Sequence, residues 1–172
     1  MKKNIVILMT VLLSFIACGK NDSEETSGTV TINNERFMSQ TYYIYGFLFS
    51  TGEIVATTST TPPDITVDTD GTTVKFEASN YKNSFYKAGE YNDAAAAKTA
   101  FDNLKTVNVT AWEEWANPLK ENQIWIYRTR SECYAKIRIV SLLKEVRNER
   151  NYTECTFEWV YQPDGTTTFP AK

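Results

Sequence analysis

The sequence contains no histidine among its 172 residues. Histidine is the commonest general base near neutral pH, the commonest zinc ligand and a usual axial ligand of haem iron. Its absence excludes Ser-His-Asp and Cys-His catalysis and leaves carboxylates or lysine as acid-base groups. Glu113 and Glu114, beside Trp112 and Trp115, are the least implausible such acids, and a solvated loop explains them just as well. We therefore expect a protein that is not an enzyme.

Basic residues are also fewer than acidic residues. Lys and Arg number 18 and Asp and Glu 21, and Lys2 and Lys3 lie at the very start of the chain. Nucleic-acid binding depends on clustered Lys and Arg that face phosphates. An acidic chain without such a cluster argues against a nucleic-acid partner. Aromatic residues, with four Trp among them, suit strands and surfaces that bind sugars or other rings.

Long hydrophobic runs are confined to the N-terminus. The apolar stretch over residues 5–17 is shorter than the about 20 residues of a membrane-spanning helix and is typical of an export signal. It ends in Phe15-Ile16-Ala17-Cys18, which resembles the lipobox of bacterial lipoproteins. The resemblance implies that residues 1–17 are a cleaved signal peptide and that the Cys18 thiol carries a diacylglycerol. The alternative is an ordinary signal peptide followed by a chance cysteine.

The segment after the lipobox is polar. Residues 19–28 contain no apolar side chain, so residues 18–28 are expected to form a flexible acidic tether. Asp22, Glu24 and Glu25 resemble the acidic export signal of surface lipoproteins in one group of diderm bacteria. We therefore expect a lipid-anchored protein of the outer membrane at the cell surface, with the periplasmic face as the alternative. Residues 29–172 suit a single domain with its own core.

The first half of that domain has the pattern of β-hairpins. A strand is expected at residues 29–33, and a hairpin over residues 41–58 turns at Thr51-Gly52. After Pro62-Pro63, a second hairpin over residues 64–78 turns at Asp70-Gly71, which tolerates positive φ. The stretch from Asp68 to Gly71 resembles the start of a calcium loop but lacks the further ligands and the final Glu. We expect it to be a turn.

One helix is predicted, over residues 93–104. Asn92 or Asp93 provides the N-cap, and four successive alanines favour the helix. The apolar residues at 97, 100, 101 and 104 share one face, which should pack on a sheet. Residues 110–119 are expected to form a helical turn or an ordered loop.

The last third predicts three strands, at residues 123–129, 134–143 and 152–161. In the third, Cys155, Phe157 and Trp159 should point into the core, and Glu154, Thr156 and Glu158 should form a wet outer face. A change of phase at Val140 indicates a β-bulge. A final short strand is expected at residues 166–169. The predicted fold class is therefore mainly β (a β-rich α+β fold), an antiparallel meander of hairpins with one short alanine-rich helix.

Two cysteines remain if Cys18 carries lipid. An exported protein can form disulfides, but the spacing of Cys133 and Cys155 does not decide between a bridge and two free thiols. Both states stay open at this point.

Segments at residues 122–129, 134–139 and 156–165, together with Tyr45-Gly46-Phe47-Leu48-Phe49-Ser50-Thr51-Gly52, resemble the HmuY-type family of surface lipoproteins. The resemblance implies an all-β fold, a surface location and capture of haem from host proteins. That family's founding members hold haem through histidines, so no binding residue carries over to this chain. No cofactor is therefore expected. Haem would need Met38, a tyrosine such as Tyr42, Tyr43 or Tyr45, or a cysteine as its axial ligand.

The functional expectation is a binding module. We expect an anchored lipoprotein that captures a nutrient or other ligand, attached to the membrane through its N-terminal lipid, with an outer-membrane transporter or complex as partner. The alternative is a structural or accessory subunit of an outer-membrane complex.

Overall fold

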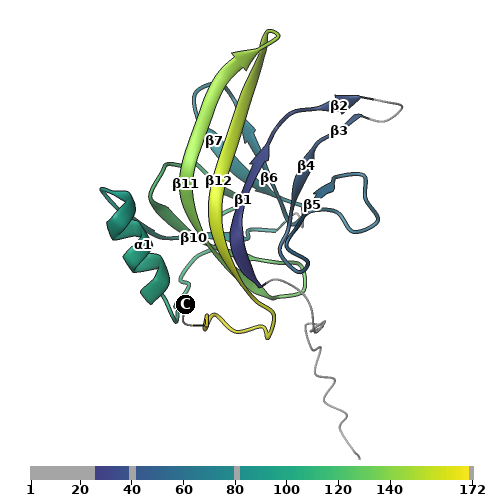
Figure 1. Cartoon of the computed structure of the whole chain (residues 1–172). Helices are drawn as coiled ribbons and strands as arrows, with labels where there is room; N and C mark the ends of the chain where they lie inside the picture. Colours follow the sequence, from purple (N-terminus) through teal and green to yellow (C-terminus); the bar gives the residue numbers. More distant parts are fainter. Residues whose placement is uncertain (1–25, 39–41, 80–81, 171–172) are drawn as a thin grey trace, which may run out of the picture.

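The computed structural model describes residues 26–38, 42–79 and 82–170, and the signal segment, Cys18 and most of the tether lie outside this part. Within it, two five-stranded antiparallel sheets face each other, accompanied by a two-stranded ribbon and one helix (Figure 1). The predicted mainly β fold with one short helix is confirmed. The strands form two sheets because hairpins from each half of the domain stack their apolar faces against each other.

The first sheet has the strand order β1-β12-β11-β10-β8. Three of its strands form the predicted meander, and β11 and β12 extend as one long curved hairpin (Figure 1). The bulge near Val140 is confirmed, because the register shifts between Ile139 and Ser141. The strand bounds are β1 Ser27–Asn33, β8 Phe85–Glu90, β10 Gln123–Arg128, β11 Tyr134–Arg147 and β12 Arg150–Gln162.

The second sheet has the order β5-β4-β6-β7-β9, and it contains both predicted N-terminal hairpins. Gly52 and Gly71 take positive φ at the two turns, as their positions predict. A short ribbon of β2 and β3 precedes this sheet. The bounds are β2 Phe37–Met38, β3 Tyr42–Tyr43, β4 Tyr45–Leu48, β5 Glu53–Ala56, β6 Ile65–Thr69, β7 Val74–Ala78 and β9 Trp115–Ala116.

The main core lies between the two sheets. Phe157 and Trp159 point into it from β12, as the alternation predicts, and both pack edge-on against Phe47 of β4. Aromatic pairs of this geometry add about 0.5–1.5 kcal/mol beyond the area they bury. The core therefore fixes how the sheets stack, and with it the loops at the ends of their strands.

Helix α1 (Ala94–Asn103) lies outside the first sheet, next to β10 and β11 (Figure 1). Asp93 caps it by accepting a hydrogen bond from the Ala96 N–H, which confirms one of the two predicted caps. Its apolar face, with Phe101 fully buried, forms a second core on the outer face of the sheet. In the part of the chain that the structure describes, no helix is long and apolar enough to cross a membrane.

The expected wet outer face of β12 is wrong at Glu158, which is only 6% exposed. Lys136 and Arg138, the polar residues on the same face of β11, are also buried. The alternation itself is correct, but α1 covers this face and excludes water. Sequence alternation shows which residues share a face but does not show what packs on that face.

Three expected segments differ from the structure, and one strand was not expected. Strand β1 begins at Ser27, two residues inside the expected tether. Residues 110–119 form a loop with the short strand β9 and no helical turn. Residues 166–169 make only an isolated bridge, between Thr168 and Thr106. Strand β8 was not among the expected strands; it forms by pairing with the distant strand β10.

Candidate functional site

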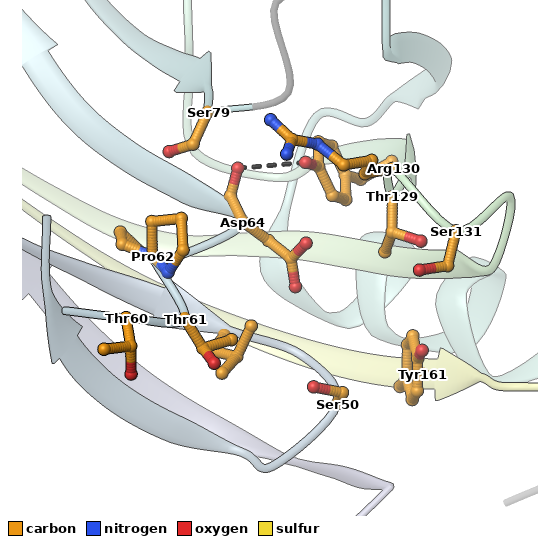
Figure 2. A pocket seen from close by; sticks show the side chains of 13 residues that line it. Ser50, Thr60, Thr61, Pro62, Asp64, Ser79, Thr129, Arg130, Ser131 and Tyr161 are labelled. Atoms are coloured by element: carbon orange, nitrogen blue, oxygen red, sulfur yellow. Dashed lines mark hydrogen bonds between the residues drawn. The ribbon is translucent and has the colours of Figure 1, made fainter. Parts of the chain in front are cut away.

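A cavity of about 270 Å³ opens at the end of the sandwich opposite the β11–β12 turn. It lies where the loop before β6 meets the ends of β7, β10 and β12 (Figure 2). The lining combines one carboxyl group, from Asp64, with the guanidinium of Arg130 and the rings of Tyr127 and Tyr161. Six hydroxyl side chains complete the wall: Ser50, Thr60, Thr61, Ser79, Thr129 and Ser131.

Asp64 is held firmly at the base of this cavity. Its backbone N–H donates to the Phe47 carbonyl at 2.9 Å, and its own carbonyl accepts from the Ser79 N–H at 3.0 Å and the Tyr127 hydroxyl at 2.9 Å. Its Oδ2 accepts from the Phe49 N–H at 2.9 Å. Figure 2 shows the Asp64 carboxyl group pointing into the cavity, between the walls that contain Ser50 and Thr129. A group fixed in this way needs little reorganisation to bind a ligand.

The local sequence explains the position of Asp64. Pro62-Pro63 keeps the chain extended before β6, because proline fixes φ and disfavours a helical conformation before it. Pro63 is buried against Gly46 of β4, where an added Cβ would lie 2.7 Å from the Pro63 Cβ and 2.3 Å from the Ile65 carbonyl oxygen. Gly46 therefore allows the loop to approach β4 closely enough to seat Asp64.

Burial changes the acid-base properties of two groups here. It raises the pKa of Asp64 to about 6, and the hydrogen bond from the Phe49 N–H opposes part of that rise. Burial also raises the pKa of Tyr127, the negative charge of Asp64 adds to the rise, and the positive charge of Arg130 opposes it. Near neutral pH the site thus presents a carboxylate and a guanidinium of opposite charge.

The arrangement suits recognition of a small polar ligand. Carboxylate oxygens accept hydrogen bonds, the guanidinium donates them, and hydroxyl groups do both. Within the described residues, Asp64 Oδ2 has the Phe49 N–H as its partner, and no hydrogen bond is made by Oδ1. In the same part of the chain, no three Asp, Glu or Cys side chains gather as ligands for a metal ion. The site therefore has the groups to hydrogen-bond a small polar ligand.

The predicted site residues lie elsewhere. Cys18 is outside the described residues, and for Met38 the structure describes only the backbone, in β2. Tyr43 and Tyr45 form an aromatic cluster with Phe37, at ring-centroid distances of 5.1–5.9 Å, and none of the three lines the cavity.

The acidic pair from the sequence is not part of the site either. Glu113 and Glu114 are exposed, and the Glu113 backbone pairs with Phe85. In the calcium-like stretch, the Asp70 carboxylate accepts from the Thr72 and Thr73 N–H groups at 2.7 Å. These contacts close a turn.

Cys133 and Cys155 do not bridge each other, because Cys155 is a free thiol. Complete burial raises the pKa of that thiol well above its usual range. A protonated thiol surrounded by core side chains is a poor nucleophile. Cys155 is therefore a packing residue.

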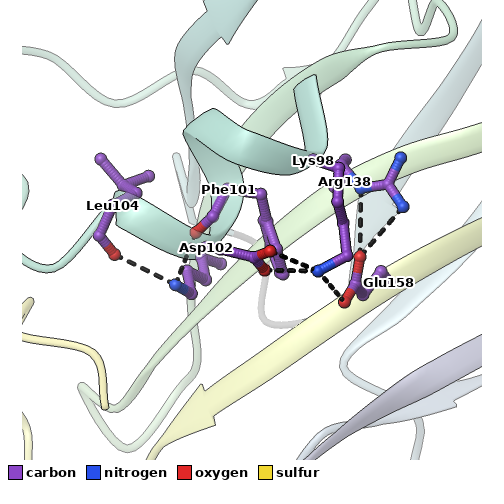
Figure 3. Close-up of polar contacts among 7 residues, drawn as sticks. Lys98, Phe101, Asp102, Leu104, Arg138 and Glu158 are labelled. Atoms are coloured by element: carbon purple, nitrogen blue, oxygen red, sulfur yellow. Dashed lines mark hydrogen bonds and ion pairs between the residues drawn. The ribbon is translucent and has the colours of Figure 1, made fainter. Parts of the chain in front are cut away.

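A second polar cluster lies beneath α1 (Figure 3). The Lys136 ammonium donates to the carbonyls of Phe101 at 2.7 Å and Leu104 at 3.1 Å, where the helix ends. Arg138 contacts Oε2 of Glu158 through Nε at 3.1 Å and Nη2 at 3.0 Å. The Phe101 carbonyl also accepts from the Leu104 N–H at 3.3 Å, and the positive charge of Lys136 lies at the C-terminus of the helix, where a cation is favourable. These groups attach the helix to the sheet, and we assign them a structural role.

Asp64 and Arg130 are the site residues that sequence reasoning did not identify. Asp64 was assigned to the start of a strand, and Arg130 to a polar turn between two strands. The sequence signal for Asp64 is an acid directly after Pro62-Pro63, where the chain cannot continue as a regular strand. Arg130 carries no such signal, since only the stacking of the two sheets brings its turn beside Asp64.

Comparison with family models, with curated proteins and with solved structures found no match to this chain.

Proposed function

We propose that this chain is a lipoprotein anchored to the outer membrane through Cys18, where it captures a small hydroxyl-bearing ligand in the cavity around Asp64. The signal segment and lipobox support the anchoring, and the acidic residues 22–25 support display at the cell surface. The resemblance to HmuY-type lipoproteins agrees with this location.

The observation that carries the binding proposal is the fixed carboxyl group of Asp64 inside a cavity lined with hydroxyls. Polar groups that converge in a concave, pre-formed site are typical of ligand recognition. Its volume of about 270 Å³ lies just below the range for small-molecule pockets, about 300–1,000 Å³. A single sugar ring or a molecule of similar size fits a cavity of this volume better than a large macrocycle does.

Protein-detected NMR with D-glucose, D-galactose and N-acetyl-D-glucosamine as probes tests the proposal. At least one sugar should shift the amide resonances of Phe49, Asp64 and Ser79 in a saturable way, and Asp64→Asn should weaken the effect. Asp70→Asn, in a turn that does not line the cavity, is the matched control and should bind as the original does. Absence of saturable shifts with all three sugars would contradict the proposal.

The anchor is tested by Cys18→Ser followed by cell fractionation. The variant should move from the membrane fraction to the soluble fraction, because it lacks the thiol to which the lipid would be attached. Several acyl chains together give a durable membrane anchor, and the variant would lose them. External protease should degrade the unaltered protein on intact cells. Protection that ends only when the outer membrane is permeabilised would place it on the periplasmic face.

The alternative role, as an accessory subunit of an outer-membrane complex, is favoured by one observation. Phe37 is 37% exposed and stacks with Tyr43 on the short β2–β3 ribbon. Exposed aromatic residues are enriched where proteins meet. Co-purification of a transporter with the unaltered protein, lost in Phe37→Ser, would support this role.

A further inference from the structure

A second hollow, of about 550 Å³, adjoins the Asp64 cavity. The two share Pro62, Ser79 and Arg130 as lining residues, so they lie next to each other on either side of Arg130. The capture site is therefore longer than the end cavity alone.

The floor of this second hollow is the outer face of the second sheet. Thr66, Asp68 and Glu77 line it, whereas Val67 and Phe76 beside them point into the core. Thr66 and Glu77 are direct cross-strand partners on β6 and β7. Because strands place alternate residues on opposite faces, the polar residues of β6 and β7 form a row on the outer face of the sheet.

The walls of the hollow come from the chain that leads into the second sheet. Arg36 and Tyr43 line it from the β1–β2 link and β3. Asn34 fixes Asp68 by donating to its Oδ1 at 3.1 Å, and its own Oδ1 accepts from the Thr153 N–H at 2.9 Å. This contact connects the floor of the hollow to β12, so the hollow is part of the rigid sandwich.

We infer that the site binds a neutral glycan chain, with one sugar unit in the Asp64 cavity and the following units along the Arg130–Thr66–Glu77 hollow. This inference rests on the proposed function and extends it to a substrate class. Carboxylates and guanidinium groups match the paired hydroxyls of sugars. The ring of Tyr43 offers an apolar surface with a polar tip, of the kind that binds ring-shaped ligands.

The charge of the hollow favours a neutral chain. Asp64, Asp68 and Glu77 supply three carboxyl groups, and the guanidinium groups of Arg36 and Arg130 together with the Lys75 ammonium, 2.6 Å from Glu77, balance them, so neither sign of charge dominates. A polyanion would place its charges beside these carboxylates, and like charges at short range repel. Neutral sugars avoid this cost and use the same groups as hydrogen-bond partners.

A peptide fits the hollow less well. Extended peptides commonly bind by adding a strand to a free sheet edge. Strands β6 and β7 pair with each other along their whole length, and neither is an end strand of its sheet. The β7 side of β6 is therefore closed to an added strand, while β4 pairs with β6 at Ile65. Most of the side chains that line the hollow are polar or charged.

The test combines an array of neutral glycans with calorimetry on the tightest binder. The full protein should bind at least one array member, and affinity should rise about tenfold from the monosaccharide to the trisaccharide of that series. Tyr43→Ala should reduce trisaccharide affinity roughly tenfold, the range expected for one lost ring contact. It should leave monosaccharide affinity unchanged, and Glu77→Gln provides a second groove variant with the same expected pattern.

Three results would overturn the inference of a glycan chain. Equal affinity for the monosaccharide and the trisaccharide would overturn the glycan-chain inference while the capture of a small ligand stands. Loss of both monosaccharide and array binding would overturn the inference and the proposed function together. Binding of a peptide library with no array glycan bound would also overturn it.

Discussion

The buried carboxyl group of Asp64 should make the protein less stable as the pH rises. Its pKa is about 6 in the folded protein, against an ordinary value of 3.8. Below about pH 3 the group is largely protonated in both the folded and the unfolded chain and adds no penalty. Above about pH 7 it is ionised in both, and the folded state carries the full cost of a poorly solvated charge. The raised pKa of Asp64 therefore means that the free energy of unfolding is higher at low pH and falls as the pH rises through the pKa of about 6.

The size of the effect follows from the shift. One pKa unit corresponds to about 1.4 kcal/mol, so a shift of roughly two units corresponds to about 3 kcal/mol. Asp64→Asn keeps the side-chain shape and an oxygen that can accept the Phe49 N–H, but removes the charge. The free energy of unfolding of the variant, minus that of the original, should grow by about 3 kcal/mol between about pH 3 and pH 7. Urea unfolding followed by tryptophan fluorescence at several pH values measures this difference.

Asp70→Asn provides a control of opposite sign. The N–H groups of Thr73 and Thr72 lower the pKa of Asp70, so its contribution is present above its unfolded pKa and lost as the pH falls. Its replacement should weaken the protein more at neutral pH than at acidic pH. If the Asp64→Asn difference stays flat or shrinks as the pH rises, the assignment of Asp64 as a desolvated carboxyl group is refuted.

Four further outcomes are expected. Glu158→Ala should lower the free energy of unfolding by about 3–5 kcal/mol, because it leaves Arg138 buried without this partner; a loss below about 0.5 kcal/mol would restore the wet-face assignment. Lys136→Met should destabilise the protein by about 1–3 kcal/mol, measured by urea unfolding, because it removes the hydrogen bonds of the ammonium group to the Phe101 and Leu104 carbonyls. Gly46→Ala should cost about 1–3 kcal/mol from overpacking and should also weaken sugar binding in the NMR titration, whereas unchanged binding would show that the loop seats Asp64 without this close approach. Haem added to the protein should give no saturable Soret shift in an absorbance titration; a stoichiometric shift that disappears in Met38→Ala would identify an unexpected ligand.

Local patterns in the sequence account for most of the secondary structure. The Asp70-Gly71 turn, the Asp93-capped helix and the three C-terminal strands depend on residues close together in the chain, and the structure contains all of them. Strand β8 was missed because its pairing with β10 depends on a distant partner. Strand propensity depends on such neighbours far more than helix propensity does.

The alternation of β12 determined by itself that Phe157 and Trp159 share a face opposite Glu158, because strand side chains repeat every two residues. Only the tertiary structure decided that α1 covers that opposite face and turns an expected surface acid into a buried partner of Arg138. The same holds for the candidate site. Asp64 and Arg130 lie 66 residues apart in the chain and line one cavity because the two sheets stack, and long-range packing of this kind has no periodic signal in a sequence.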